Sequence, residues 1–218
     1  MTCSCMTRKI AAVVCLLAFI GMLSADEERK WLLYRVDFSK IESGELPADF
    51  LVMEGSFSIE KTGDETYLKL SPTPLVDSAV QLGVRIKGDG AILVRIKAES
   101  EGRRAPSFGV GLHGVSGFQL TVAPSGRKIE LKHGAEIVQS SKFKWRTGEW
   151  YFVELRVLEN GSNWTVSGRV WAESEKKPDA AQIEYIADVK LMKGRAYVSG
   201  MPSSGRAIYF DDIEIRTR

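Results

Sequence analysis

The side chains that could perform catalysis are few, and their spacing matches no catalytic motif. A retaining glycosidase, for example, needs two carboxyl groups about 5 to 5.5 Å apart. The acids that cluster in this chain are Glu173 with Glu175, and Asp211 and Asp212 with Glu214. Neither cluster has the composition or the place that such a pair requires. The two histidines, His113 and His133, have no cysteine or serine partner in a nucleophile motif. We therefore predict a protein without catalytic activity, and the alternative is an enzyme whose carboxylates converge from separate loops.

The same sequence offers side chains suited to binding a polar ligand. Aromatic rings offer apolar surface, and neighbouring polar side chains can form hydrogen bonds with a ligand. The candidate ligand-binding residues are Arg95, His113, Gln119, Glu154, Arg156, Arg169, Trp171, Trp150 and Trp145. A surplus of arginine and lysine favours an acidic glycan or another anionic polymer, provided that neighbouring acids do not neutralise those charges. The alternative is an ordinary solvated sheet face, with the tryptophans as packing residues and Glu154 in a structural ion pair with Arg156.

These candidates lie on short runs typical of β-strands, and the chain shows almost no helical spacing. Apolar and β-branched residues alternate or cluster between Gly, Pro, Asn, Asp and Ser. We predict strands at residues 32–38, 56–61, 67–71, 79–86, 91–98, 107–113, 118–123, 128–132, 150–159, 163–173, 195–199 and 207–216. The segment from Lys176 to Asp188 is predicted to be a short helix or a long loop. Strands at this spacing predict an all-β sandwich of two antiparallel sheets.

The hairpin around Asn160-Gly161 gives the clearest local signal. Asn-Gly favours a type I′ turn, because both central residues of that turn need a positive φ. This turn would place Glu159 opposite Ser162. The face predicted to be buried holds Tyr151, Val153, Leu155 and Val157 against Trp164, Val166, Gly168 and Val170. The opposite face holds Trp150, Phe152, Glu154 and Arg156 against Thr165, Ser167, Arg169 and Trp171.

Other strands divide in the same way. The residues predicted to face the core are Ile92, Val94, Ile96, Phe108, Val110, Leu112, Phe118, Leu120 and Val122. If these strands share one sheet with the hairpin, their outward residues join its polar face. Gly109 and Gly111 would then leave room above the backbone for a ligand.

The N-terminal segment is predicted to be a secretory signal peptide. The basic Arg8-Lys9 precedes the apolar run from Ile10 to Leu23, which ends at the small residues Ser24 and Ala25. The run is short for a membrane span, so a retained anchor is the weaker alternative. We predict residues 1–25 as the signal peptide, with the cleavage site open by a few residues. Residues 26–218 then form one secreted or periplasmic domain, with no membrane span in the mature chain.

Removal of this segment changes the composition of the protein. Cys3, Cys5 and Cys15 all lie in it, so the mature chain has neither a disulfide nor a thiolate metal ligand. The full chain has 30 Lys and Arg against 28 Asp and Glu, and loss of Arg8 and Lys9 makes the two numbers equal. A formally neutral domain gives no argument for a nucleic-acid partner. The oligomeric state and the identity of the ligand do not follow from the sequence.

Five motifs, taken in order, resemble one family. They are Asp37-Phe38, Gly44–Pro47, Glu54–Phe57 leading into Leu68–Leu70, Lys144–Tyr151 and Ile208–Ile215. The first three are similar to the start of concanavalin A-like lectin/glucanase domains. The fourth resembles the strand-opening motif of laminin G-like modules, and the last resembles their closing strand. The chain is also similar to secreted bacterial domains related to family 16 glycoside hydrolases, although it lacks the Glu-x-Asp-x-Glu run of those enzymes.

The resemblance implies a concanavalin A-like jelly roll with one concave sheet. Its commonest ligand is carbohydrate, bound on the concave face or at the loops of its rim. Aromatic rings stack on the apolar faces of sugars, while neighbouring polar side chains bind the hydroxyl groups. No cofactor is required, but many such domains hold one structural Ca²⁺ on the convex side, where the first and last strands meet. Asp211 or Asp212, Gly55 and Asp37 match the positions that would hold it. The alternative is that Asp211-Asp212 only lies at the edge of the last strand.

We therefore predict a non-catalytic, secreted or periplasmic carbohydrate-binding module. A structural or protein-interaction domain of a secreted assembly is the alternative, and a divergent glycoside hydrolase is the third candidate. Open aromatic side chains along a groove would favour the binding module. Tryptophans that are buried, or that lie in a flat apolar patch, would favour the interaction domain.

Overall fold

Fifteen strands and one short 3-10 helix, η1 (Pro124–Gly126), make up the regular structure of the described residues. The computed structural model describes residues 32–217 except 102–104, 191–192 and 204. From Leu33 onward the chain belongs to one compact unit. The predicted signal peptide and its cysteines lie outside the described residues. Within the described part of the chain, no helix is long and apolar enough to span a bilayer.

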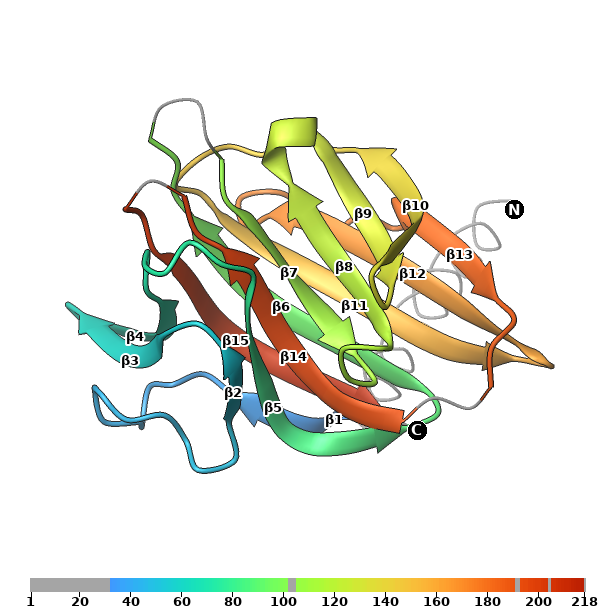
Figure 1. The fold of residues 1–218 in the computed structure, drawn as a ribbon, viewed down its shortest axis with the longest axis horizontal. Helices are drawn as coiled ribbons and strands as arrows, with labels where there is room; N and C mark the ends of the chain where they lie inside the picture. The colour runs from blue at the N-terminus through green and yellow to red at the C-terminus, as the bar shows by residue number, and fades with distance from the viewer. Residues whose placement is uncertain (1–31, 102–104, 191–192, 204, 218) are drawn as a thin grey trace, which may run out of the picture. The chain divides into compact units, whose positions relative to one another are not determined.

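The strands form two antiparallel sheets, seen as two layers in Figure 1. In spatial order, the eight-stranded sheet contains β13 (Ile183–Ala187), β12 (Asn163–Ala172), β11 (Trp150–Asn160), β6 (Gly90–Ala98), β15 (Ile208–Thr217), β4 (Glu65–Leu70) and β3 (Phe57–Thr62), with β1 (Leu32–Val36) also paired to β15. The seven-stranded sheet contains β10 (Glu136–Lys142), β9 (Lys128–His133), β8 (Phe118–Ala123), β7 (Ser107–Leu112), β14 (Lys193–Met201), β5 (Ser78–Lys87) and β2 (Leu51–Glu54). The predicted all-β, two-sheet jelly-roll sandwich is confirmed.

All twelve predicted strands are present, with small shifts at their ends. Three further strands, β2, β10 and β13, were not predicted, and each lies at the edge of a sheet. The prediction of a helix or a loop from Lys176 to Asp188 is wrong in part. Within that segment Ile183–Ala187 pairs with β12, because its apolar residues can complete the edge of the eight-stranded sheet.

The core lies where alternating apolar side chains of the two sheets face each other. In β6, Ile92, Val94 and Ile96 have no exposed surface, and the residues between them point outward. Phe108, Val110 and Leu112 of β7 are buried in the same way from the opposite sheet. Each large apolar side chain buried in this manner contributes roughly 1.5–3 kcal/mol. The hydrophobic alternation read from the sequence therefore places both sheets correctly around one core.

The β11–β12 hairpin differs from its prediction in register. Asn160 pairs with Asn163, so the turn residues are Gly161-Ser162. Gly161 has a φ of 66°, and Ser162 is not among the non-glycine residues with positive φ. This is the pattern of a type II′ turn, with glycine at its first central position. The predicted pairing of Glu159 with Ser162 is wrong, but a shift of two residues keeps every side chain on its face. The predicted inner and outer faces of the hairpin are therefore confirmed.

Gly168 marks a point where the two sheets come close together. A Cβ atom at this position would lie 2.8 Å from Leu120 of β8 and 2.8 Å from Ile183 of β13. We expect Gly168→Ala to lower the free energy of unfolding by about 1–3 kcal/mol, because an added methyl group overpacks the core. Urea denaturation measures this change. Ser167→Ala, at the adjacent outward position, is the control, and equal effects of the two substitutions would contradict the overpacking argument.

Candidate functional site

The predicted ligand-binding residues are divided among three places. The outer face of the eight-stranded sheet carries Arg95, Glu154, Arg156, Arg169, Trp150 and Trp171. The seven-stranded sheet and its turns carry His113 and Gln119, and Trp145 lies between β10 and β11. The interpretation that all these strands share one sheet is wrong, because the chain crosses from β6 in one sheet to β7 in the other. Since the inner faces of both sheets meet in the core, their outer residues point away on opposite sides of the sandwich.

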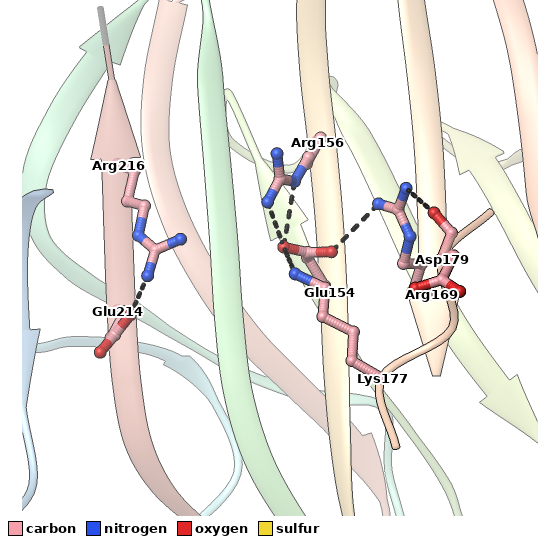
Figure 2. A network of polar contacts seen from close by, with 7 residues as sticks. All are labelled: Glu154, Arg156, Arg169, Lys177, Asp179, Glu214 and Arg216. Atoms are coloured by element: carbon pink, nitrogen blue, oxygen red, sulfur yellow. Dashed lines mark hydrogen bonds and ion pairs between the residues drawn. The ribbon is translucent and has the colours of Figure 1, made fainter. Parts of the chain in front are cut away.

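Glu154 is the centre of a buried ion-pair cluster on the eight-stranded sheet (Figure 2). Its carboxylate oxygens lie 2.8 Å from Arg156 Nη2, 3.2 Å from Arg169 Nη1 and 3.0 Å from Lys177 Nζ. Only 2% of Glu154 is exposed. Burial acts to raise the pKa of the Glu154 carboxyl, but Arg156 and Lys177 outweigh it and hold that pKa below its usual value. The predicted ion pair with Arg156 is present, within a larger cluster.

The same cluster holds Arg169 in place and covers Trp171. Arg169 also donates a hydrogen bond from Nη2 to the backbone oxygen of Asp179 at 3.3 Å (Figure 2). The Trp171 ring stacks on Phe152, with centroids 5.4 Å apart and planes at 24°. The Lys177 ammonium lies 5.6 Å from the centroid of the Trp171 ring. Trp171 is therefore packed between neighbouring side chains and offers no open platform to a ligand.

Arg95 holds a second ion-pair cluster, on the neighbouring strand β6. Its guanidinium lies 2.9 Å from Glu173, 3.2 Å from Asp211 and 4.1 Å from the ring centroid of Trp150. Burial raises the pKa of the Asp211 carboxyl to about 6, against the lowering effects of the Asp212 backbone N–H and of Arg95. Taken together, the two clusters set four cations, Arg95, Arg156, Arg169 and Lys177, against four carboxylates, Glu65, Glu154, Glu173 and Asp211. This face therefore gives no support for the expectation of an acidic glycan.

A pocket of about 270 Å³ opens beside Arg95 on the same face. We call it the Trp150 pocket, and it is lined by Glu60, Thr62, Glu65, Tyr67, Lys97, Glu99, Trp150 and Tyr209. Lys97 of β6 pairs with Trp150 of β11 on one side and with Tyr209 of β15 on the other. The sheet register thus sets these three side chains in one row. The β3–β4 hairpin, which turns at Gly63-Asp64, supplies the lining residues between positions 60 and 67.

Three aromatic rings gather at this pocket. Tyr67 lies edge-on to Tyr209, with centroids 4.9 Å apart, and 6.4 Å from Trp150. Tyr67 is buried, whereas Trp150 and Tyr209 are half-buried and keep part of their surface open. Burial raises the pKa of the Tyr209 hydroxyl, so this group stays protonated and can donate a hydrogen bond. The pocket thus combines apolar ring surface with hydrogen-bonding groups.

The carboxylates of the pocket come from separate elements, and each has a basic partner. Glu60 pairs with Lys69, Glu65 lies 3.8 Å from Arg95, and Glu99 lies 3.9 Å from Lys97. These three glutamates, and Tyr67 and Tyr209, were not among the candidates predicted from the sequence. Only the strand order β11-β6-β15-β4-β3 brings them to Trp150, and linear spacing carries no signal for that order.

The outer face of the seven-stranded sheet is filled by its own side chains. A Cβ atom at Gly111 would lie 2.1 Å from the Tyr197 ring, and one at Gly109 would lie 2.1 Å from a backbone oxygen of β8. Gln119 donates a hydrogen bond from Nε2 to Ser199 Oγ at 2.7 Å. The interpretation that the two glycines leave room for a ligand is wrong, because neighbouring groups occupy that space.

His113, at the end of β7, connects two turns through a contact of its side chain with the backbone. Its Nε2 lies 2.8 Å from the backbone oxygen of Gly88, and its backbone has a φ of 65°. The residue is 3% exposed. Burial lowers the pKa of the His113 imidazole, although the contact with Gly88 acts in the opposite direction. His113 lines neither the Trp150 pocket nor the groove around Trp145 described below.

The four residues predicted to hold Ca²⁺ show no shared ligand set. Asp211 is already in an ion pair, and Asp37 accepts hydrogen bonds from the backbone N–H and the hydroxyl of Ser39 at 3.1 and 2.7 Å. Gly55 has a φ of 91° and packs closely on β5, and Asp212 lies in a bulge of β15 with a φ of 46°. Among the described residues, no group of three or more His, Cys, Asp and Glu side chains could hold a metal ion. Backbone carbonyl groups also serve as calcium ligands, so calcium at this place stays a prediction.

Solved structures share this fold at low sequence identity. The carbohydrate-binding module CBM66 from Bacillus subtilis matches with a TM-score of 0.55 and 11% identity, over 78% of this chain and 96% of that chain. Winged bean acidic lectin, in complex with methyl-α-D-galactose, gives a TM-score of 0.58 and 10% identity, over 84% of this chain and 97% of that chain. The catalytic domain of the glycoside hydrolase family 131 protein from Coprinopsis cinerea gives 0.55 and 9%, over 86% of this chain and 95% of that chain.

No protein-family model matches the sequence, and a search of curated proteins finds no match. The structural similarities therefore define the fold, which is that of the concanavalin A-like lectin/glucanase sandwiches. The predicted resemblance to that group is confirmed at the level of fold. Binding modules, lectins and a catalytic domain all share this architecture, so the function has to be argued from the site.

Proposed function

We propose that this chain is a carbohydrate-binding module that holds a sugar in the Trp150 pocket. One observation carries the proposal: three aromatic rings meet carboxylate, ammonium and hydroxyl groups around about 270 Å³ on the outer face of a sheet. Sugar recognition needs apolar ring surface beside groups that bind hydroxyls. The similarity of the fold to carbohydrate-binding modules and lectins supports the proposal.

Each part of the pocket has a role in this proposal. The half-buried rings of Trp150 and Tyr209 offer the apolar surface for one face of a sugar. Glu60 and Glu99 accept hydrogen bonds from hydroxyl groups, and Lys97 donates them. Hydrogen bonds to charged groups are stronger than those between neutral groups. Pockets for small ligands commonly measure about 300–1,000 Å³, so the size favours a single sugar residue or the end of a chain.

We propose binding without catalysis. Each glutamate of the pocket already has a lysine or arginine partner, which supports a structural role for these carboxylates. The predicted signal peptide, residues 1–25, adds a secreted or periplasmic location to the proposal. The glycan would then be an extracellular or cell-envelope component.

A protein-interaction domain is the second candidate, and one observation favours it. The edge strand β2 exposes the successive apolar side chains of Leu51, Val52 and Met53. An open sheet edge with apolar side chains can pair with another chain. The sugar titration below separates the two candidates.

The purified protein should bind neutral sugars, and Trp150→Ala should weaken that binding at least tenfold. A tenfold change corresponds to about 1.4 kcal/mol, and an aromatic pair contributes about 0.5–1.5 kcal/mol beyond its buried area. Isothermal titration with a panel of neutral mono- and oligosaccharides measures the affinity. Because none of the residues predicted to hold calcium lines the pocket, we expect the same affinity with added calcium and with a chelator.

Ile186→Ala is the matched control, because Ile186 is 51% exposed and lies on the same sheet but does not line the pocket. Since Trp150 also packs against Arg95, Thr62→Val and Glu99→Gln test the pocket without removing a packed ring. All three pocket variants should bind less tightly than Ile186→Ala. Unchanged binding in all three would contradict the site, absence of binding to every sugar would favour the interaction domain, and release of shorter sugars would establish a hydrolase.

A further inference from the structure

A second concave site, a groove of about 950 Å³, opens at one end of the seven-stranded sheet. We call it the Trp145 groove, and its lining residues are Ala105, Pro124, Gly126, Arg127, Lys142, Phe143, Lys144 and Trp145. They come from three segments: the chain just before β7, the β8–β9 turn that contains η1, and the chain that leaves β10. Figure 1 shows η1 at the end of the sheet, at the top of the view, where β8 ends and β9 begins. The groove is therefore a rim site, separate from the outer face that carries the Trp150 pocket.

The charged residues of the Trp145 groove are all basic. Arg127, Lys142 and Lys144 are exposed, and the lining contains no acid. In the part of the chain that the structure describes, none of the three forms an ion pair. Arg95 and Arg169 of the eight-stranded sheet are, by contrast, held by carboxylates. Unpaired cations around a concave surface attract anionic ligands.

Two aromatic rings alternate with the lysines along this wall. Phe143 follows Lys142 and Trp145 follows Lys144, so each ring has a cation beside it in the chain. Both rings are half-buried. The Trp145 ring packs against Phe108, with centroids 6.4 Å apart, and the Phe143 ring packs against Tyr151, with centroids 5.9 Å apart. The indole N–H of Trp145 is buried without a hydrogen-bond acceptor. The groove thus offers fixed ring surface together with positive charge.

The backbone of Arg127 is held in a strained conformation at this site. Its φ is 50°, in the left-handed region that a residue with a Cβ atom adopts at a cost. Its N–H donates to the oxygen of Pro124 at 2.9 Å, and its own oxygen accepts from the N–H of Phe143 at 2.9 Å. The second of these bonds joins the β8–β9 turn to the segment that leaves β10. Glycine would adopt the same conformation with less strain, and strain of this kind is often retained at functional sites.

We propose that the Trp145 groove binds an acidic glycan, a sugar chain that bears carboxylate or sulfate groups. The rings supply stacking surface for sugar residues, and the three cations pair with the acidic groups. A glycan is favoured over a nucleic acid because the whole chain has a formal net charge of only +2, whereas nucleic-acid-binding domains are commonly strongly basic. This site is independent of the Trp150 pocket, so each can be tested while the other is intact.

The test measures binding of the purified protein to polygalacturonate, dextran sulfate and uncharged dextran by biolayer interferometry. We expect binding to the two acidic polymers at about 0.01 M ionic strength, where the screening length is about 30 Å, and loss of it at about 1 M, where that length is about 3 Å. A triple variant, Arg127→Gln, Lys142→Gln and Lys144→Gln, should bind at least about tenfold more weakly, because several modest charge contacts are lost together. The charge-matched control is Lys61→Gln, Lys87→Gln and Lys193→Gln, at exposed positions outside the groove.

Arg127→Gly separates ligand binding from folding. It removes one cation and relieves the backbone strain, so the melting temperature should hold or rise while binding to the acidic polymers weakens. A fall in melting temperature with unchanged binding would assign Arg127 a structural role and contradict the proposal. Equal loss of binding in the control triple variant, or tighter binding to an oligothymidylate than to polygalacturonate, would also overturn it. Trp150→Ala should leave acidic-polymer binding intact, so failure of this proposal and failure of the Trp150 pocket give different results.

Discussion

Replacement of Glu154 by glutamine is expected to lower the free energy of unfolding by about 3 kcal/mol at neutral pH. Glutamine keeps the volume of the side chain but removes the negative charge that faces Arg156, Arg169 and Lys177. Removing one partner of a buried ion pair costs about 3–5 kcal/mol. We expect the low end of that range because the side chains of Arg156 and Lys177 are 27% and 38% exposed and keep part of their hydration. Urea denaturation of the two proteins measures the difference.

Glu214→Gln is the control for this prediction. Glu214 pairs with Arg216 at 2.6 Å on the same sheet (Figure 2), but its side chain is 17% exposed, against 2% for Glu154. We expect a loss below about 1 kcal/mol, as for other surface pairs. The pH dependence has a definite sign. Because the folded-state pKa of Glu154 lies below its usual value, its contribution is present above that value and is lost only as the pH falls through the lowered pKa. Equal losses in the two variants would contradict the central role of Glu154.

Hydrophobic alternation is clear in the interior strands and weaker in some of the edge strands. An interior strand has neighbours on both sides and one face on the core, so its apolar residues alternate clearly, as in β6. The three strands that were not predicted, β2, β10 and β13, are all edge strands. Leu51, Val52 and Met53 of β2 are exposed in succession, and β10 has mostly polar residues. Edge strands such as β2 and β10 lack clear alternation, so hydrophobic pattern alone does not identify them. The edge strand β3 alternates, and it was predicted.

The error in the hairpin register has a comparable cause. The residues Asn160-Gly161-Ser162 can form a two-residue turn at either of two positions, and Asn-Gly is the stronger local signal. The observed turn pairs Glu154 directly with Arg169, whereas the predicted register would have placed Ser167 opposite Glu154. Pairing of the two charges is a non-local contribution that turn preferences do not contain. Because both registers keep the same faces, the prediction of the core survives the error.

The candidate site shows the same limit of sequence reasoning. Trp150, Trp145 and Arg95 were identified because alternation predicts their direction from the sheet or because aromatic rings stack on sugars. Their usefulness to a ligand depends on neighbours from other strands, such as Tyr209 for Trp150 and Arg127 for Trp145. Alternation also cannot show whether a charged residue is already paired. The structure makes that distinction: it pairs the arginines on the sheet face and leaves unpaired cations at the rim.

Replacement of Arg95 by methionine is expected to destabilise the protein by about 2 kcal/mol at about pH 8, and by clearly less at about pH 5. Methionine can still pack on Trp150, but it leaves the buried carboxylate of Asp211 without its cation, at the cost of an unpaired buried group. The pKa of Asp211 is already raised to about 6, chiefly by burial. The favourable contribution of Asp211 to the free energy of unfolding is therefore complete below the unfolded-state pKa of its carboxyl group. It is lost as the pH rises through about 6. Without Arg95 the folded-state pKa of Asp211 rises further, so the decrease in the free energy of unfolding caused by Arg95→Met is larger at alkaline pH.

Asp211→Asn provides the background that isolates this effect. Asparagine has nearly the same shape as aspartate and does not titrate. Adding Arg95→Met to the Asp211→Asn protein should therefore lower the free energy of unfolding by the same amount at both pH values. Urea denaturation of the four proteins at each pH gives the coupling between the two residues. A loss that does not depend on pH in the single variant would mean that Arg95 stabilises the sheet by packing on Trp150 and by its pair with Glu173, and not through Asp211. In that case the main role of Arg95 would be to support the Trp150 ring, which lines the Trp150 pocket.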